Sequence, residues 1–125
     1  MFRKIALTLM MLAPAAFAAQ LGVDGLHDAP WIEETFLDLR EDHEEARSQG
    51  KTLMVIIEQR GCIYCTRLHE NVFPDPEVEA TLTENFYVVQ LNMFGDLEVT
   101  DFDGAVLPEK EMVSRWQRTR SPRKL

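Results

Sequence analysis

Basic residues are scarce in this chain. Among 125 residues, 13 are Lys or Arg and 21 are Asp or Glu, which gives a formal net charge of −8 at pH 7. A domain with this net negative charge repels the phosphate backbone of a nucleic acid, so nucleic-acid binding is not expected. The sequence has no internal repeat, no low-complexity tract and only one long apolar span, at its N-terminus. These absences favour one small acidic domain with a core that is barely sufficient.

Cysteine is also scarce, because Cys62 and Cys65 are the only two. No second C-x-x-C or H-x-x-H completes a structural zinc site, and Thr66 rather than His follows Cys65, which excludes haem attachment. The pair therefore has three interpretations: a redox-active dithiol, a short structural disulfide, or a metal site shared with His69. The sequence favours the dithiol, and neither a metal nor a bound organic cofactor is expected.

The one long apolar span resembles a secretory signal peptide. Arg3 and Lys4 precede an apolar run over residues 5–12, and the small-residue sequence Ala16-Phe17-Ala18 follows. This span is too short to cross a membrane, and cleavage is expected after Ala18 or Ala19. Loss of Arg3 and Lys4 then changes the net charge from −8 to −10. We expect an exported protein, periplasmic in a diderm bacterium, with no stable membrane insertion after cleavage.

Both cysteines lie between a predicted strand and a predicted helix. Residues 53–57 are continuously apolar and rich in β-branched side chains, which predicts a strand buried on both faces. A helix is predicted next, with one apolar face formed by Cys65, Leu68, Val72 and Phe73. The free N–H groups and the dipole at the start of that helix favour the thiolate form of Cys62. Cys65, one turn further on, is placed to resolve a mixed disulfide.

The flanking segments complete an α/β pattern. Residues 31–50 predict a helix with an acidic outer face and Gly50 as its C-cap. Asp75 is predicted to cap another helix, with Pro76 in its first turn. Residues 86–93 predict a second buried strand, so the two strands and the intervening helix form a parallel βαβ unit.

After the second strand, the sequence predicts a hairpin and a last helix. Asp103-Gly104 is read as the hairpin turn, because the twelve-residue ligand pattern of a calcium loop is missing. A short helix is predicted from Pro108 to about Trp116. The chain beyond it is basic and short, so we expect the domain to be C-terminally incomplete, with an unpaired sheet edge beside the strand at residues 53–57.

The order of motifs resembles that of a known family. The segment Glu58-Gln59-x-Gly61-Cys62-x-Tyr64-Cys65, with His69, is followed by Asn92-x-x-Gly95-Asp96 and by Thr100-Asp101-Phe102-Asp103-Gly104. Over roughly residues 36–122 this resembles the secreted thioredoxin-fold proteins of the SoxW type. The resemblance implies an α/β fold with a thioredoxin-like βαβ core, helices on a small mixed sheet, and the last strands and helix of the fold missing. The implied organisation is a signal peptide (1–19), an N-terminal arm (20–35) and a thioredoxin-like domain (36–125).

The same resemblance implies an activity. Such proteins exchange disulfides with other exported proteins, and the SoxW type is associated with sulfur-oxidation or cytochrome-maturation machinery. Cys62 would be the attacking thiol and Cys65 the resolving thiol of a reductase. The expected oxidising compartment, rather than the resemblance, indicates the electron donor: something must keep the pair reduced there, and a membrane thiol reductase is the candidate. The alternative is a non-catalytic thioredoxin-like fragment or binding module with a fixed Cys62–Cys65 disulfide.

The supporting residues differ from the family pattern at one position. Many thioredoxins carry a buried acid six residues before the first cysteine, where this chain has Ile56. Glu58 is the nearest acid and the candidate for its proton role, with His69 and Tyr64 as further supporting residues. Pro122 matches the cis-proline that lies opposite the cysteines in the family.

Overall fold

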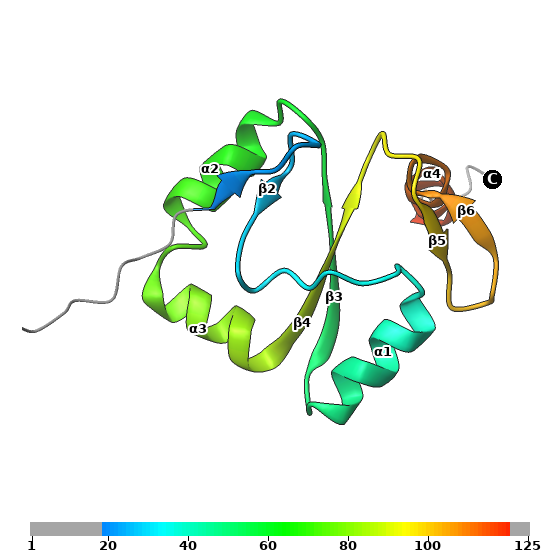
Figure 1. Cartoon of the computed structure of the whole chain (residues 1–125), viewed down its shortest axis with the longest axis horizontal. Coiled ribbons are helices and arrows are strands. Elements are labelled where there is room, and N and C mark those ends of the chain that lie inside the picture. The colour runs from blue at the N-terminus through cyan, green and yellow to red at the C-terminus, as the bar shows by residue number, and fades with distance from the viewer. Residues whose placement is uncertain (1–18, 121–125) are drawn as a thin grey trace, which may run out of the picture.

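The computed structural model describes residues 19–120 (Figure 1). Along the chain the elements are β1 (Gln20–Leu21), β2 (His27–Asp28), α1 (Leu39–Ser48), β3 (Thr52–Glu58), α2 (Ile63–Asn71), α3 (Pro76–Asn85), β4 (Phe86–Asn92), β5 (Glu98–Thr100), β6 (Val106–Pro108) and α4 (Glu109–Arg120). Within this range no helix combines the length and the apolar character needed to span a membrane. The predicted signal peptide, apart from Ala19, lies outside the described residues, and so does Pro122.

The centre of the fold is the parallel pair β3 and β4. Their register runs from Thr52 opposite Phe86 to Glu58 opposite Asn92, and α2 and α3 form the crossover between them. The predicted βαβ unit is therefore confirmed. Figure 1 shows the two strands crossing the middle of the molecule, with α2 and α3 on one side and α1, β5, β6 and α4 on the other.

Two apolar clusters pack on the opposite faces of β4. Val89 and Leu91 point into the larger one, with Leu39 and Met112 from α1 and α4. Val88 points the other way, toward a cluster that includes Trp31 and Leu82. Alternate side chains of a strand face opposite sides, so the apolar sequence of β4 fills both clusters.

Burial of β3 differs from the sequence prediction. The strand was expected to be buried on both faces, but residues 53–56 are half-buried and the Ile57 side chain is 43% exposed. The prediction was wrong because β3 pairs with β4 and with no other strand among residues 19–120. Its outer edge is unpaired over this range, as the sequence predicted.

Residues 31–38 form no helix, where the sequence predicted the first half of one. Ile32 forms a bridge with Val88, and the Glu33 N–H donates to the Val88 carbonyl at 2.7 Å. The backbone thus adds to the free side of β4, which a helix would not do. The helix begins at Leu39, capped by Asp38, and ends before the Gln49 cap. Gly50, the predicted cap, lies one residue later with φ 68°.

The remaining predicted elements are present. The Asp75 carboxylate accepts hydrogen bonds from the N–H groups of Glu77 and Val78, and so caps α3 as predicted. β5 and β6 pair as a hairpin whose turn contains Gly104 with φ 88°. The last helix, α4, extends beyond its predicted end at Trp116 to Arg120.

Candidate functional site

The two cysteines form a disulfide at the start of α2. Gly61, with φ 73°, turns the chain out of β3, and Cys62 is the N-cap of the helix, as the sequence predicted. The sulfur–sulfur distance to Cys65 is 2.15 Å. The Cys65 N–H also lies 3.1 Å from the Cys62 Sγ and donates to it. In the reduced state this N–H and the helix dipole would stabilise a thiolate at Cys62.

The outer surface of α2 is more apolar than expected. Leu68 and Val72 were predicted to face inward, but their side chains are 43% and 41% exposed. Tyr64, between the cysteines, is 71% exposed, and its ring lies 5.9 Å from the guanidinium carbon of Arg67. Tyr64, Leu68 and Val72 are spaced four residues apart and therefore share one helix face, which we call the α2 patch. The patch begins between the two half-cystines.

The buried face of α2 carries His69, which is only 3% exposed. Its Nε2 lies 2.9 Å from Oε1 of Glu58, the last residue of β3. His27 of β2 also contacts Glu58: its Nδ1 lies 3.1 Å from Oε1, and its backbone N–H donates to Oε2 at 2.8 Å. Gln90 of β4 donates from Nε2 to the same Oε2 at 3.1 Å. We call these four residues the His–Glu cluster.

Glu58 and His69 are both predicted from the sequence as supporting residues, and the structure brings them together. His27 and Gln90 are not predicted from the sequence. His27 lies in a segment interpreted as a plain arm, and a single histidine there has no motif around it. Gln90 lies within an apolar strand, where a lone polar residue is a weak signal of a buried network.

The contacts constrain where the protons of the cluster lie. An ionised carboxylate at Glu58 can only accept hydrogen bonds, and the Nδ1 of His27 is a donor in that state. Burial lowers the pKa of His69, and the neighbouring His27 acts in the same direction, while the Glu58 charge opposes them. His69 is therefore neutral at pH 7, and its Nδ1 has no hydrogen-bond partner among the described residues. The result is a buried carboxylate held by imidazole and amide nitrogens rather than by Lys or Arg.

The same residue types can bind a metal ion, but the geometry does not fit one. The ligand atoms of His27, Glu58 and His69 all lie within 4.8 Å of one another. However, the two imidazole rings are stacked, with centroids 4.4 Å apart and planes only 9° from parallel. An imidazole binds a metal in its own ring plane, and one ion cannot lie in two separate parallel planes. The alternative of a site formed by Cys62, Cys65 and His69 fits no better, because His69 faces Glu58.

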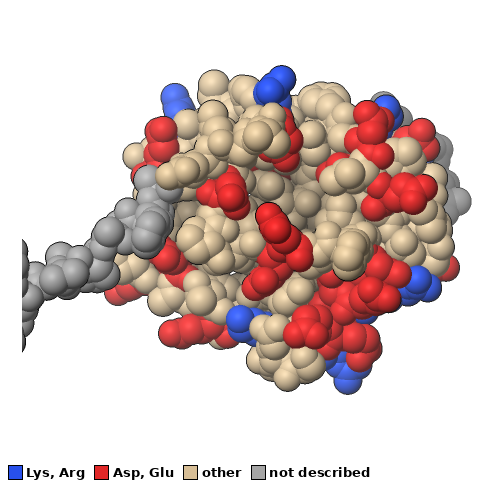
Figure 2. Space-filling model, viewed as in Figure 1, with Lys and Arg blue, Asp and Glu red and all other residues tan. Residues whose placement is uncertain are grey.

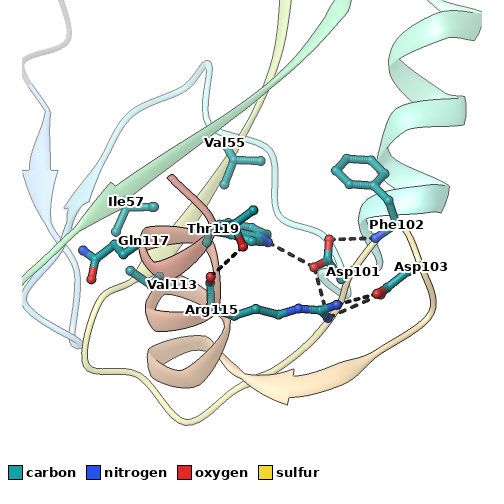
Figure 3. Close-up of a pocket in the computed structure, with 10 residues that line it drawn as sticks. Val55, Ile57, Asp101, Phe102, Asp103, Val113, Arg115, Gln117 and Thr119 are labelled. Carbon is teal, nitrogen blue, oxygen red and sulfur yellow. Dashed lines mark hydrogen bonds and ion pairs between the residues drawn. The ribbon is translucent and has the colours of Figure 1, made fainter. Parts of the chain in front are cut away.

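A groove lies beside the open edge of β3 (Figure 3). It has a volume of about 730 Å³, with Val55 and Ile57 of β3 on one side and Val113 and Trp116 of α4 on the other. Arg115 crosses its rim to form ion pairs with Asp101 and Asp103, and the Trp116 Nε1–H donates to Asp101 at 3.0 Å. These contacts give Asp101 and Asp103 a structural role.

On the face shown in Figure 2, most of the surface is uncharged, and the acidic side chains cover more of it than the basic ones do. Part of this acidic surface comes from α1, whose first turn contains the exposed Glu41. Asp42 of the same turn is buried, and burial raises its pKa.

Comparison with known families agrees with the geometry. A family model described as a thioredoxin-like domain matches residues 39–122, which is more than half of the chain. The matched region contains Glu58, Cys62, Cys65 and His69, but it begins after His27. A search of curated proteins finds no match.

Proposed function

Because the chain belongs to the thioredoxin-like family, we propose that it is a thiol–disulfide oxidoreductase that reduces disulfides in exported partner proteins through Cys62 and Cys65. The observation that carries this proposal is the Cys62–Cys65 disulfide at the N-terminus of α2, with the Cys62 sulfur accepting a hydrogen bond from the Cys65 N–H. A thiolate is the nucleophile in disulfide exchange, and this position stabilises one.

The reaction begins with the reduced protein. The Cys62 thiolate attacks one sulfur of a partner disulfide, the partner S–S bond breaks, and the departing partner sulfur takes up a proton. Cys65 then loses its proton and attacks the Cys62 sulfur, which releases the second partner thiol and forms the Cys62–Cys65 disulfide. The partner has gained two electrons and two protons. A dithiol donor must supply the same number to restore the enzyme, and we propose a membrane thiol reductase.

Glu58 and His69 are proposed to support the second step. Cys65 and His69 are four residues apart on α2, so they lie on one face of the helix. Glu58 contacts His69 and is the only acid in the cluster below the redox helix. A buried carboxylate at this place can take part in moving the Cys65 proton. It would replace the buried acid that many thioredoxins carry at the position of Ile56.

The α2 patch favours a protein substrate over a small disulfide. Tyr64, Leu68 and Val72 expose apolar surface along α2, and Tyr64 lies between the two cysteines in the sequence. Exposed apolar side chains at a reactive centre are typical of a surface that binds other chains. Residues 1–19 support export, and the motif order supports the SoxW type of this family, with a periplasmic location.

The first experiment is a redox titration of the chain without residues 1–19. The protein is equilibrated in thiol buffers of increasing reducing power, and free thiols are trapped with an alkylating tag that is counted by mass spectrometry. We expect one cooperative two-electron transition, which is lost in Cys62→Ser and Cys65→Ser. If the disulfide persists until the protein unfolds, the chain is a binding module with a fixed disulfide and the proposal is wrong.

The second experiment tests the protein substrate. Tyr64→Ser should slow reduction of insulin disulfides by roughly tenfold, as expected from removal of an aromatic contact residue, while leaving reaction with a small aromatic disulfide unchanged. Glu70→Ser, which changes an exposed residue of the same helix, is the matched control. Equal loss of both reactions in Tyr64→Ser would show that the patch does not select proteins. Fractionation of cells that express the chain with and without residues 1–19 tests export.

A further inference from the structure

The N-terminal segment before α1 is attached to the redox site, although it lies outside the region matched by the family. In Figure 1, β1 and β2 lie beside α2. Gly25, in the turn between them, approaches the loop before Cys62 so closely that a Cβ there would be 2.5 Å from the Arg60 Nε. His27 of β2 enters the His–Glu cluster itself.

His27 holds the cluster from its backbone and from its ring. Its N–H and its Nδ1 reach the two oxygens of Glu58, and its carbonyl accepts a hydrogen bond of 2.9 Å from Gln90 Nε2. Its ring stacks on His69 at 4.4 Å. Trp31, four residues later in the same segment, stacks on His69 at 6.0 Å between centroids. The segment therefore fixes both the acid and the imidazole below α2.

This attachment surrounds Glu58 with imidazole groups. The Glu58 side chain is 5% exposed, and its contacts with basic side chains among the described residues are both with histidines, His27 and His69. Two stacked imidazoles beside one carboxylate cannot both be charged without strong repulsion. The groups that face His27 are Glu58 from β3, His69 from α2 and Gln90 from β4, so a change at His27 alters the stability of the ionised Glu58 directly.

We propose that His27 is a positioning residue of the redox site, which holds Glu58 and His69 and thereby sets the equilibrium between the Cys62–Cys65 disulfide and its dithiol. This inference rests on the proposed redox activity. His27 touches neither sulfur atom in any contact described above and acts through the cluster. A buried negative charge that contacts α2 through His69 opposes formation of a thiolate at the start of that helix, so the charge state of Glu58 enters the redox equilibrium and its dependence on pH.

Two amide variants provide a matched test. Asparagine places its N–H near the position of an imidazole Nδ1, whereas glutamine places it near Nε2, so His27→Asn retains the donor to Glu58 and His27→Gln does not. The disulfide–dithiol equilibrium constant against dithiothreitol is measured from about pH 5 to about pH 8, the range in which histidines titrate. His43→Gln, on α1 and outside the cluster, is the control.

We expect His27→Gln to shift the equilibrium constant at pH 7 by about three- to tenfold, from loss of one hydrogen bond of ordinary strength, and to change its pH profile. His27→Asn should stay within about twofold of the wild type. In a Glu58→Gln background, His27→Gln should cause no further shift beyond about twofold, because the two residues act as one unit.

Three results would overturn the inference. His27→Gln and His27→Asn could both leave the equilibrium and its pH profile unchanged, or both shift them equally, which would indicate a structural role only. The effect of His27→Gln could also persist in full without Glu58. Each of these leaves the proposed activity intact, provided that the wild type shows its two-electron transition. Absence of that transition in the wild type would overturn both proposals.

Discussion

Removal of the Glu58 carboxylate is the most informative single change for stability. In Glu58→Ala, the backbone N–H and the Nδ1 of His27 lose their partner, and the Nε2 of His69 loses its contact with Oε1. Gln90 Nε2 keeps only its hydrogen bond to the His27 carbonyl. Each buried polar group without a partner costs about 1–3 kcal/mol. We therefore expect the free energy of unfolding to fall by about 4 kcal/mol, a large part of the roughly 5–15 kcal/mol of a small domain.

The assay is urea unfolding of the oxidised protein, followed by circular dichroism. With a urea dependence of about 2 kcal/mol per molar, the midpoint should fall by about 2 M while the slope stays constant. Glu70→Ala, an exposed neighbour on α2, should change stability by less than about 0.5 kcal/mol. A loss below about 1 kcal/mol in Glu58→Ala would refute the reasoning, because the donors would then have found other partners.

Three further predictions concern local contacts. Asp75→Ala removes the cap of α3 and should lower the free energy of unfolding by about 1 kcal/mol, measured by urea unfolding. The Arg40 side chain lowers the pKa of Asp38 to about 2, so Arg40→Ala should return that pKa toward 3.8 in a carboxylate NMR titration, and an unchanged value would exclude the ion pair as the cause. Burial lowers the pKa of His69, so the unfolded chain binds more protons than the folded chain at acidic pH. The free energy of unfolding should therefore fall as the pH drops below about 6.5. Urea unfolding at several pH values should show a weaker dependence in His69→Gln.

Local sequence signals predicted the elements that the chain forms within a few residues. Asp75-Pro76 capped a helix, Asp103-Gly104 formed a hairpin turn and Cys62 began α2, because each depends on backbone groups close in sequence. The parallel βαβ unit also followed from two apolar runs around a helix. The Cys62–Cys65 part of the candidate site was therefore visible from the sequence.

Contacts between distant segments were not visible. The apolar spacing after Trp31 suits a helix, yet the chain there is not helical, because Ile32 and Glu33 bond to the free side of β4 around Val88. The same pairing carries the N-terminal segment across the molecule and brings His27 to Glu58. No pattern near position 27 signals that contact, since its partners are 31 and 63 residues away.

The unpaired edge of β3 has a consequence for amide hydrogen exchange. The Glu58 carbonyl accepts a hydrogen bond from the Met93 N–H at 2.8 Å, so the backbone groups of Glu58 face β4. In a parallel ladder, the N–H and C=O of one residue point to the same side of the strand, and those of the next residue point to the other side. The amides that face the open edge are those of Leu53, Val55 and Ile57. Exchange along this one strand should therefore alternate between fast and slow with a period of two residues, and any chain that pairs with the edge should slow only the fast set.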